Sequence, residues 1–124
     1  MTTRKDDFKT NIDRLELVID ALYTAEELEE NKDNKDKIQT ACTIYRQAMA
    51  DTYKEWIEDL KKKADTERWN IVSHMNQKWL NANDIREDTK ATDTILFRLE
   101  KIYTEMEKCE EGLNNLKKYK GVQI

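Results

Sequence analysis

The chain has 124 residues, which is the size of one domain and argues against a two-domain enzyme with a large cleft. Charged residues make up 39% and hydrophobic residues 38%, with two glycines and no proline, so the sequence is too poor in turn residues for sandwiches, barrels or βαβ folds and predicts an all-α protein. The 22 basic and 26 acidic side chains give a net charge of −4, which provides no general attraction for nucleic acid or anionic membranes.

The first helix is predicted near residues 4–30. One row of apolar residues steps by four and three along a single face, as in a bundle core. A second row, Leu17, Ala21 and Leu28, lies on another side of the same helix. Such a helix is either central or contacts a partner. The first row consists of Phe8, Ile12, Leu15, Ile19 and Leu22.

The second helix is predicted near residues 35–82, after a polar connection and a cap at Asp33 or Asn34. Its apolar residues follow steps of mostly four and three, and only Glu67 interrupts the row. A repeat of this kind keeps the apolar row nearly parallel to the axis of an ordinary α-helix. The row consists of Ile38, Cys42, Tyr45, Met49, Tyr53, Trp56, Leu60, Ala64, Ile71, Met75, Trp79 and Ala82.

Residues 61–66 decide whether the second helix is continuous. They offer a possible stop and a possible cap but neither glycine nor proline, so we expect one unbroken helix. The alternative is a four-helix bundle with a break near Asp65.

The third helix is predicted near residues 84–120, starting at a capping box of Asp84 and Glu87. Gly112 is expected to cost up to about 1 kcal/mol relative to alanine within it. Gly121 suits the left-handed position that ends a helix, and residues 121–124 form a short tail. A strict heptad pattern predicts a coiled-coil seam, formed by Ile95, Leu99, Ile102, Met106, Cys109, Leu113 and Leu116.

No group of residues predicts catalysis, a cofactor or a metal site. His74 is the single histidine and has no acidic residue three or four positions away, and its neighbour Ser73 points about 100° away on a helix. Cys42 and Cys109 fall on apolar rows, where a thiol behaves as a small hydrophobe. We therefore expect a protein that is not an enzyme.

Trp69 and Val72 lie on the far side of the second helix from its core row, and with Trp79 they form a second seam. Either a middle helix that contacts two neighbours or a docked partner explains this seam. This seam and the second row on the first helix together favour the interpretation that a partner protein docks here, because aromatic residues outside a core are preferred interface anchors. The predicted partner-binding residues are Leu17, Ala21, Leu28, Trp69, Val72 and Trp79.

The sequence thus predicts one helical domain over residues 1–124, an elongated antiparallel three-helix bundle with coiled-coil character. The expected function is a protein–protein interaction subunit or scaffold of a larger assembly, such as a cytoskeletal or trafficking complex, with self-association as one form of binding. No segment reaches the roughly 18 apolar residues of a membrane span, so we expect a reducing, cytoplasmic location. The alternative function is a bundle that binds an apolar small molecule or lipid against Trp56, Met49, Met75 and Met106.

Overall fold

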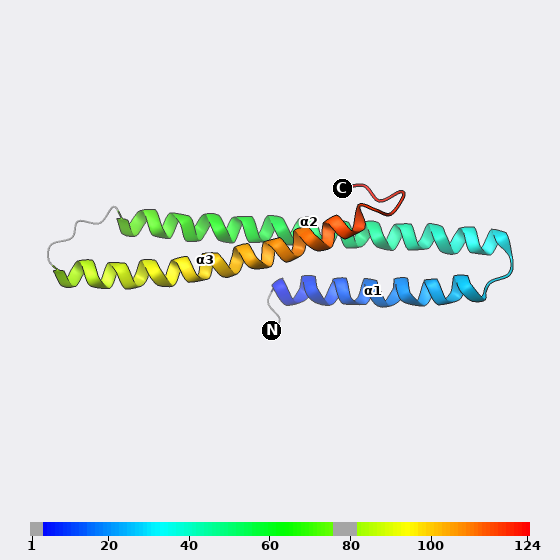
Figure 1. Cartoon of the computed structure of the whole chain (residues 1–124), viewed down its shortest axis with the longest axis horizontal. Coiled ribbons are helices and arrows are strands. Elements are labelled where there is room, and N and C mark those ends of the chain that lie inside the picture. Colours follow the sequence, from blue (N-terminus) through cyan, green and yellow to red (C-terminus); the bar gives the residue numbers. More distant parts are fainter. Residues whose placement is uncertain (1–3, 76–81) are drawn as a thin grey trace. The chain divides into compact units, whose positions relative to one another are not determined.

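The computed structural model describes residues 4–75 and 82–124, and these residues form three α-helices and no strand. The helices are α1 (Arg4–Leu28), α2 (Lys32–Met75) and α3 (Ala82–Leu116), shown in chain order in Figure 1. The chain divides into two compact units, one of Met1–Trp56 with Cys109–Ile124 and one of Ile57–Lys108. The prediction of an all-α, three-helix protein is confirmed.

Helix α2 runs without interruption through residues 61–66, so the alternative with a break near Asp65 is wrong. Neither glycine nor proline interrupts this segment, and ion pairs three or four residues apart lie along it, as expected for neighbours on a helix surface. These pairs are Lys61–Glu58 at 3.4 Å, Lys63–Asp59 at 3.3 Å and Arg68–Asp65 at 2.6 Å.

The connection between α1 and α2 is shorter than predicted. Helix α1 ends at Leu28 instead of residue 30, and α2 begins at Lys32 instead of residue 35. The side-chain oxygen of Asn31 accepts a hydrogen bond from the backbone N–H of Asn34 at 3.2 Å. Asn31 is therefore the N-cap, and the predicted caps Asp33 and Asn34 lie inside the helix.

The predicted bounds of the other helix ends also change. The part of the second helix predicted over residues 76–81 lies outside the described residues. Helix α3 begins at Ala82, two residues before the predicted cap Asp84, and ends at Leu116 instead of residue 120. The last carbonyls are satisfied by tight turns, in which the N–H groups of Lys117 and Tyr119 donate to residues 114 and 116. Gly121 has a φ of 89° within the following turn and is not a helix cap.

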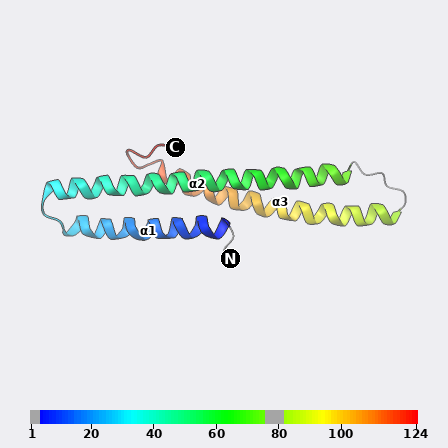
Figure 2. The same cartoon turned by 180° about the vertical axis from the view of Figure 1, so that it is seen from behind.

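The first unit is built on antiparallel packing of α1 against the first half of α2, as both views show (Figures 1 and 2). Asn11 donates a hydrogen bond to the Thr52 hydroxyl at 3.0 Å, and Gln39 donates to the Glu26 carboxylate at 3.0 Å. These two bonds fix the register of the pair. The buried core of the unit also includes the end of α3 and consists of Ile12, Ile19, Met49, Ala50 and Leu116.

Helix α2 turns a slightly different face inward than the sequence predicted. Tyr45, expected in the core row, is exposed, whereas Ala50, Thr52 and Ile57 are buried. The reason is that α2 contacts α1 on one side and the end of α3 on another, so its buried surface is wider than a single row. Arg46, next to Tyr45, contacts the ring of Tyr23 on α1 and the ring of Tyr119, which follows α3.

The second unit pairs the second half of α2 with most of α3. Leu60, Ala64, Ile95 and Leu99 are among its buried residues. Glu67, the one polar interruption of the predicted row, forms two contacts with Arg98, from Arg98 Nε to Oε1 at 3.2 Å and from Nη2 to Oε2 at 3.2 Å. Both carboxylate oxygens of Glu67 are thus paired with the guanidinium of Arg98 on the facing helix.

The C-terminal tail is held against the first unit. The Gln47 side-chain amide donates to the carbonyl of Gln123 at 2.9 Å and accepts from its N–H at 2.7 Å. Lys54 donates to the same carbonyl at 3.3 Å, and Val122 packs against the core. The predicted short tail therefore has defined contacts.

Candidate functional site

Helix α1 carries exposed apolar residues opposite its buried row. Leu17 exposes 70% and Leu28 79% of its surface, and Ala21 between them is also exposed. A helix advances about 100° per residue, which places Leu17 about 140° from Ile12 and about 160° from Ile19, on the far side of the helix from the buried row. We call Leu17, Ala21 and Leu28 the outer stripe. The structure brings these three predicted residues together on one face.

The second unit has its own exposed apolar residues on α2. Trp69 exposes 68% and Val72 46% of its surface, and the two are three residues apart on the helix. Trp79, predicted to extend this seam, lies outside the described residues. The described part of the seam therefore consists of one large aromatic residue and one small aliphatic neighbour.

The predicted heptad seam of α3 faces inward. In the second unit, Ile95 and Leu99 are buried, and Ile102 and Met106 are partly buried. In the first unit, Leu116 belongs to the buried core cluster, with Leu113 packed against it. The remaining seam residue, Cys109, is 1% exposed. The seam therefore supplies core residues to both units.

Both cysteines are buried, and neither forms a disulfide. Burial, with a smaller contribution from the charge of Glu26, raises the pKa of Cys42 above its ordinary value of 9.0. The thiol of Cys42 therefore stays protonated and unreactive near neutral pH. Among the described residues, no group of three or more histidine, cysteine or acidic side chains is arranged to hold a metal ion.

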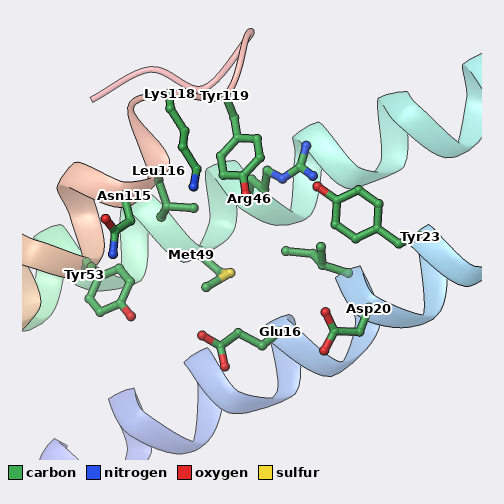
Figure 3. A pocket seen from close by; sticks show the side chains of 12 residues that line it. Glu16, Asp20, Tyr23, Arg46, Met49, Tyr53, Asn115, Leu116, Lys118 and Tyr119 are labelled. Atoms are coloured by element: carbon green, nitrogen blue, oxygen red, sulfur yellow. The ribbon is translucent and has the colours of Figure 1, made fainter.

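The first unit contains a groove of about 470 Å³ between α1, α2 and the end of the chain. Its floor is formed by the buried side chains of Ile19, Met49 and Leu116. Figure 3 shows the carboxylates of Glu16 and Asp20 extending into the groove from α1. We call this site the charged groove. The other lining residues are Tyr23, Arg46, Tyr53, Gly112, Asn115, Lys118 and Tyr119.

Two cations lie across the charged groove from those carboxylates. The Arg46 guanidinium carbon is 3.9 Å from the centre of the Tyr119 ring and 5.0 Å from that of Tyr23, and Figure 3 shows it between the two rings. The Lys118 ammonium is 5.2 Å from the Tyr119 ring. Contacts of this kind hold a cation in place through the negative face of the ring.

Of the four residues predicted to line an apolar ligand site, Met49 lies in the floor of the charged groove, and Trp56 and Met106 do not line it. Trp56 instead stacks with Phe8 and with Tyr53, at distances of 5.9 and 6.4 Å between ring centres. The side chain of Met75 lies outside those described.

Sequence reasoning missed the charged groove, although one signal pointed to it. Arg46 lies four residues after Cys42 and three before Met49, so helical spacing places its charge on a face that is otherwise buried. A cation at such a position needs a partner. Its partner Tyr119 is 73 residues away in the sequence, and no periodicity predicts that contact.

Within residues 4–75 and 82–124, no helix has the length and apolar character needed to cross a membrane. Comparison of the chain with family models, curated proteins and solved structures finds no match.

Proposed function

We propose that this chain is a non-enzymatic interaction subunit or scaffold that binds partner helices through exposed apolar residues. The observation that carries the proposal is the outer stripe on α1. A helix that buries one face in the core and exposes two leucines on the opposite face has a second surface suited to packing.

The spacing of the outer stripe fits a helical partner. Leu17, Ala21 and Leu28 recur at positions i, i+4 and i+11, so they follow one line along the helix. The small Ala21 between two leucines leaves room for a partner side chain. Complete burial of a leucine contributes about 1.5–3 kcal/mol, which offsets part of the entropy lost on association.

Trp69 and Val72 provide a second candidate surface, on the second unit. Tryptophan is over-represented among the residues that contribute most to binding energy, because it buries a large area at little entropic cost. Two exposed apolar surfaces, one on each unit, suit a subunit that holds two partners or two copies.

A reducing intracellular compartment fits this role. Cys42 and Cys109 are buried and form no disulfide, so the core packs them as thiols. The proposal includes no catalytic step.

The test uses the full chain and measures its absolute mass by light scattering over about a hundredfold concentration range, with partners identified by purification from the native source. Leu17→Glu and Trp69→Ala each change one surface and, because both residues are exposed, leave the fold intact. Ile44→Glu is the matched control, since Ile44 is 62% exposed and belongs to neither surface.

We expect Leu17→Glu to lose the native partner or assembly state, and Ile44→Glu to keep it. If Trp69→Ala also loses the partner or the assembly state, Trp69 and Val72 form a second binding surface. If both Leu17→Glu and Trp69→Ala retain every partner and the same mass, the proposed function is wrong.

A further inference from the structure

The charged groove has two walls of opposite charge. Glu16 and Asp20, one helical turn apart on α1, form the acidic wall, and Arg46 and Lys118 form the basic wall. Within the part of the chain that the structure describes, none of these four side chains forms an ion pair. The walls face each other across Met49 without neutralising each other (Figure 3).

The basic wall is arranged to receive an anion. Tyr119 and Tyr23 both contact the Arg46 guanidinium through their ring faces, and these contacts leave its N–H groups available to an anion. A guanidinium bonds carboxylates through its N–H groups in a forked geometry, and the two ring contacts hold it in place before the anion binds. Lys118, held near the same Tyr119 ring, adds a second positive charge.

The floor between the walls is apolar. Ile19, Met49 and Leu116 belong to the buried core cluster and meet the groove from below. A bound molecule therefore contacts three kinds of group in order across the groove: the carboxylates of one wall, the apolar side chains of the floor and the cations of the other wall. The volume of about 470 Å³ accommodates several side chains.

This order of charges selects among classes of occupant. A nucleic acid or an anionic membrane brings negative charge to both walls, and Glu16 and Asp20 repel it. A uniformly basic segment is repelled by Arg46 and Lys118 in the same way. The occupant must carry a cation on one side and an anion on the other, with an apolar group between them.

We propose that the charged groove binds one amphipathic partner helix of defined polarity. Its contact face places a lysine or arginine against Glu16 and Asp20, an apolar side chain over Met49, and a glutamate or aspartate against Arg46 and Lys118. Residues on neighbouring turns of a helix present three side chains of this kind on one face. Charge complementarity also fixes the direction in which the partner lies.

This site uses none of the residues of the outer stripe or of Trp69 and Val72. The charged groove and the surfaces of the proposed function can therefore be tested separately, and failure at one says nothing about the other.

The test is a peptide display selection against the full-length chain. The probe is a library of helical peptides of about 18 residues, or five turns, randomised at the positions of one face. Selection is run in parallel on the wild type and on the charge-swapped double variant Asp20→Lys/Lys118→Glu. Both residues are exposed, so the double variant has little effect on folding, which circular dichroism confirms. Because Glu16 and Arg46 remain, each wall then carries one positive and one negative charge, and the charge difference between the walls is lost.

We expect the wild type to enrich peptides with a base, an apolar residue and an acid in that order across the contact face. The double variant is expected to enrich neither this order nor its reverse, and the peptides selected on the wild type are expected to bind the wild type about tenfold more tightly than the double variant. The variant Asp20→Asn/Lys118→Gln keeps one charge on each wall, from Glu16 and Arg46, so it is expected to enrich the wild-type order with a weaker preference. It replaces the double variant if that variant does not fold.

The proposal is overturned if no peptide is enriched, if both proteins enrich the same sequences, or if only uniformly basic or uniformly acidic peptides are enriched.

Discussion

Gly112 of α3 lies directly against the ring of Tyr53 on α2: a Cβ atom at residue 112 would be 2.5 Å from Cζ and 2.7 Å from the hydroxyl oxygen of Tyr53. Both residues belong to the first unit. Real Cβ atoms essentially never approach another atom so closely, so the absence of a side chain at residue 112 is what admits the ring.

The first prediction follows from this contact. Gly112→Ala should lower the free energy of unfolding by about 1–3 kcal/mol through overpacking, despite the gain of about 1 kcal/mol in helix propensity. Urea denaturation measures the change. In a Tyr53→Leu background, where the ring is absent, the same substitution should be neutral or stabilising. If Gly112→Ala instead stabilises the otherwise wild-type protein, residue 112 does not lie against the Tyr53 ring.

The sequence predicted the helices better than their contacts. Residues 61–66 lack glycine and proline, and that absence correctly predicted a continuous α2. The same local reasoning counted Gly112 only as a cost in helix propensity. Its role depends on Tyr53, 59 positions earlier, and the register between two helices is set by packing that no single segment encodes.

The charged groove was hidden for the same reason. In the sequence, Glu16 and Asp20 look like ordinary surface charges, and Lys118 looks like part of a basic helix end. Only the placement of the chain end over α2 brings Lys118 and Tyr119 to Arg46. By contrast, the exposure of Leu17 and Trp69 could be read from helical spacing alone, because each lies on the opposite side of its helix from the buried row.

The cap of α2 gives the second prediction. Asn31→Ala should lower the free energy of unfolding by about 1 kcal/mol, because the N–H of Asn34 loses its acceptor. Asp33→Ala, at a position the sequence favoured as the cap, should cost less, since Asp33 only adds a favourable charge in the first turn. Chemical denaturation of both variants under the same conditions decides between the two caps, and a larger loss for Asp33→Ala places the cap at residue 33.

The contact between Gln47 and the tail gives the third prediction. Gln47→Ala removes two reciprocal hydrogen bonds to Gln123, which together contribute about 1–3 kcal/mol. Amide hydrogen exchange at Gln123 should accelerate, because its N–H loses its acceptor. Gln39→Ala is the matched control on the same helix: Gln39 bonds Glu26 and leaves the tail unchanged. Equal exchange at Gln123 in the two variants argues against a docked tail.

The fourth prediction concerns Glu67, whose side chain is 17% exposed and is paired with Arg98. Arg98→Ala leaves the carboxylate largely buried without its partner and should destabilise the protein by about 1–3 kcal/mol. Glu67→Leu restores the apolar row of α2 and leaves Arg98, which is 51% exposed, to solvent. Its free energy of unfolding should therefore be unchanged or higher. Equilibrium denaturation compares the two, and an equal loss in both contradicts this asymmetry.

The last prediction concerns stability at alkaline pH. Burial raises the pKa of Tyr53 above its ordinary value of 10.0, and the charges of Glu16, Cys109 and Asp13 raise it further. The folded state therefore disfavours the ionised ring, whereas the unfolded chain ionises near pH 10. The stabilisation that comes from this difference is complete below about pH 10 and is lost as the pH rises through the higher pKa of the folded protein.

Tyr53→Phe removes this titration and keeps the ring against Gly112. Its free energy of unfolding should thus fall less steeply between about pH 10 and 12 than that of the wild type. The difference in tyrosinate absorbance between the two folded proteins should show one group that titrates above the ordinary range. Identical slopes for the two proteins would mean that the phenol of Tyr53 remains in contact with water, and the groove wall beside Glu16 would then be more open than the structure indicates.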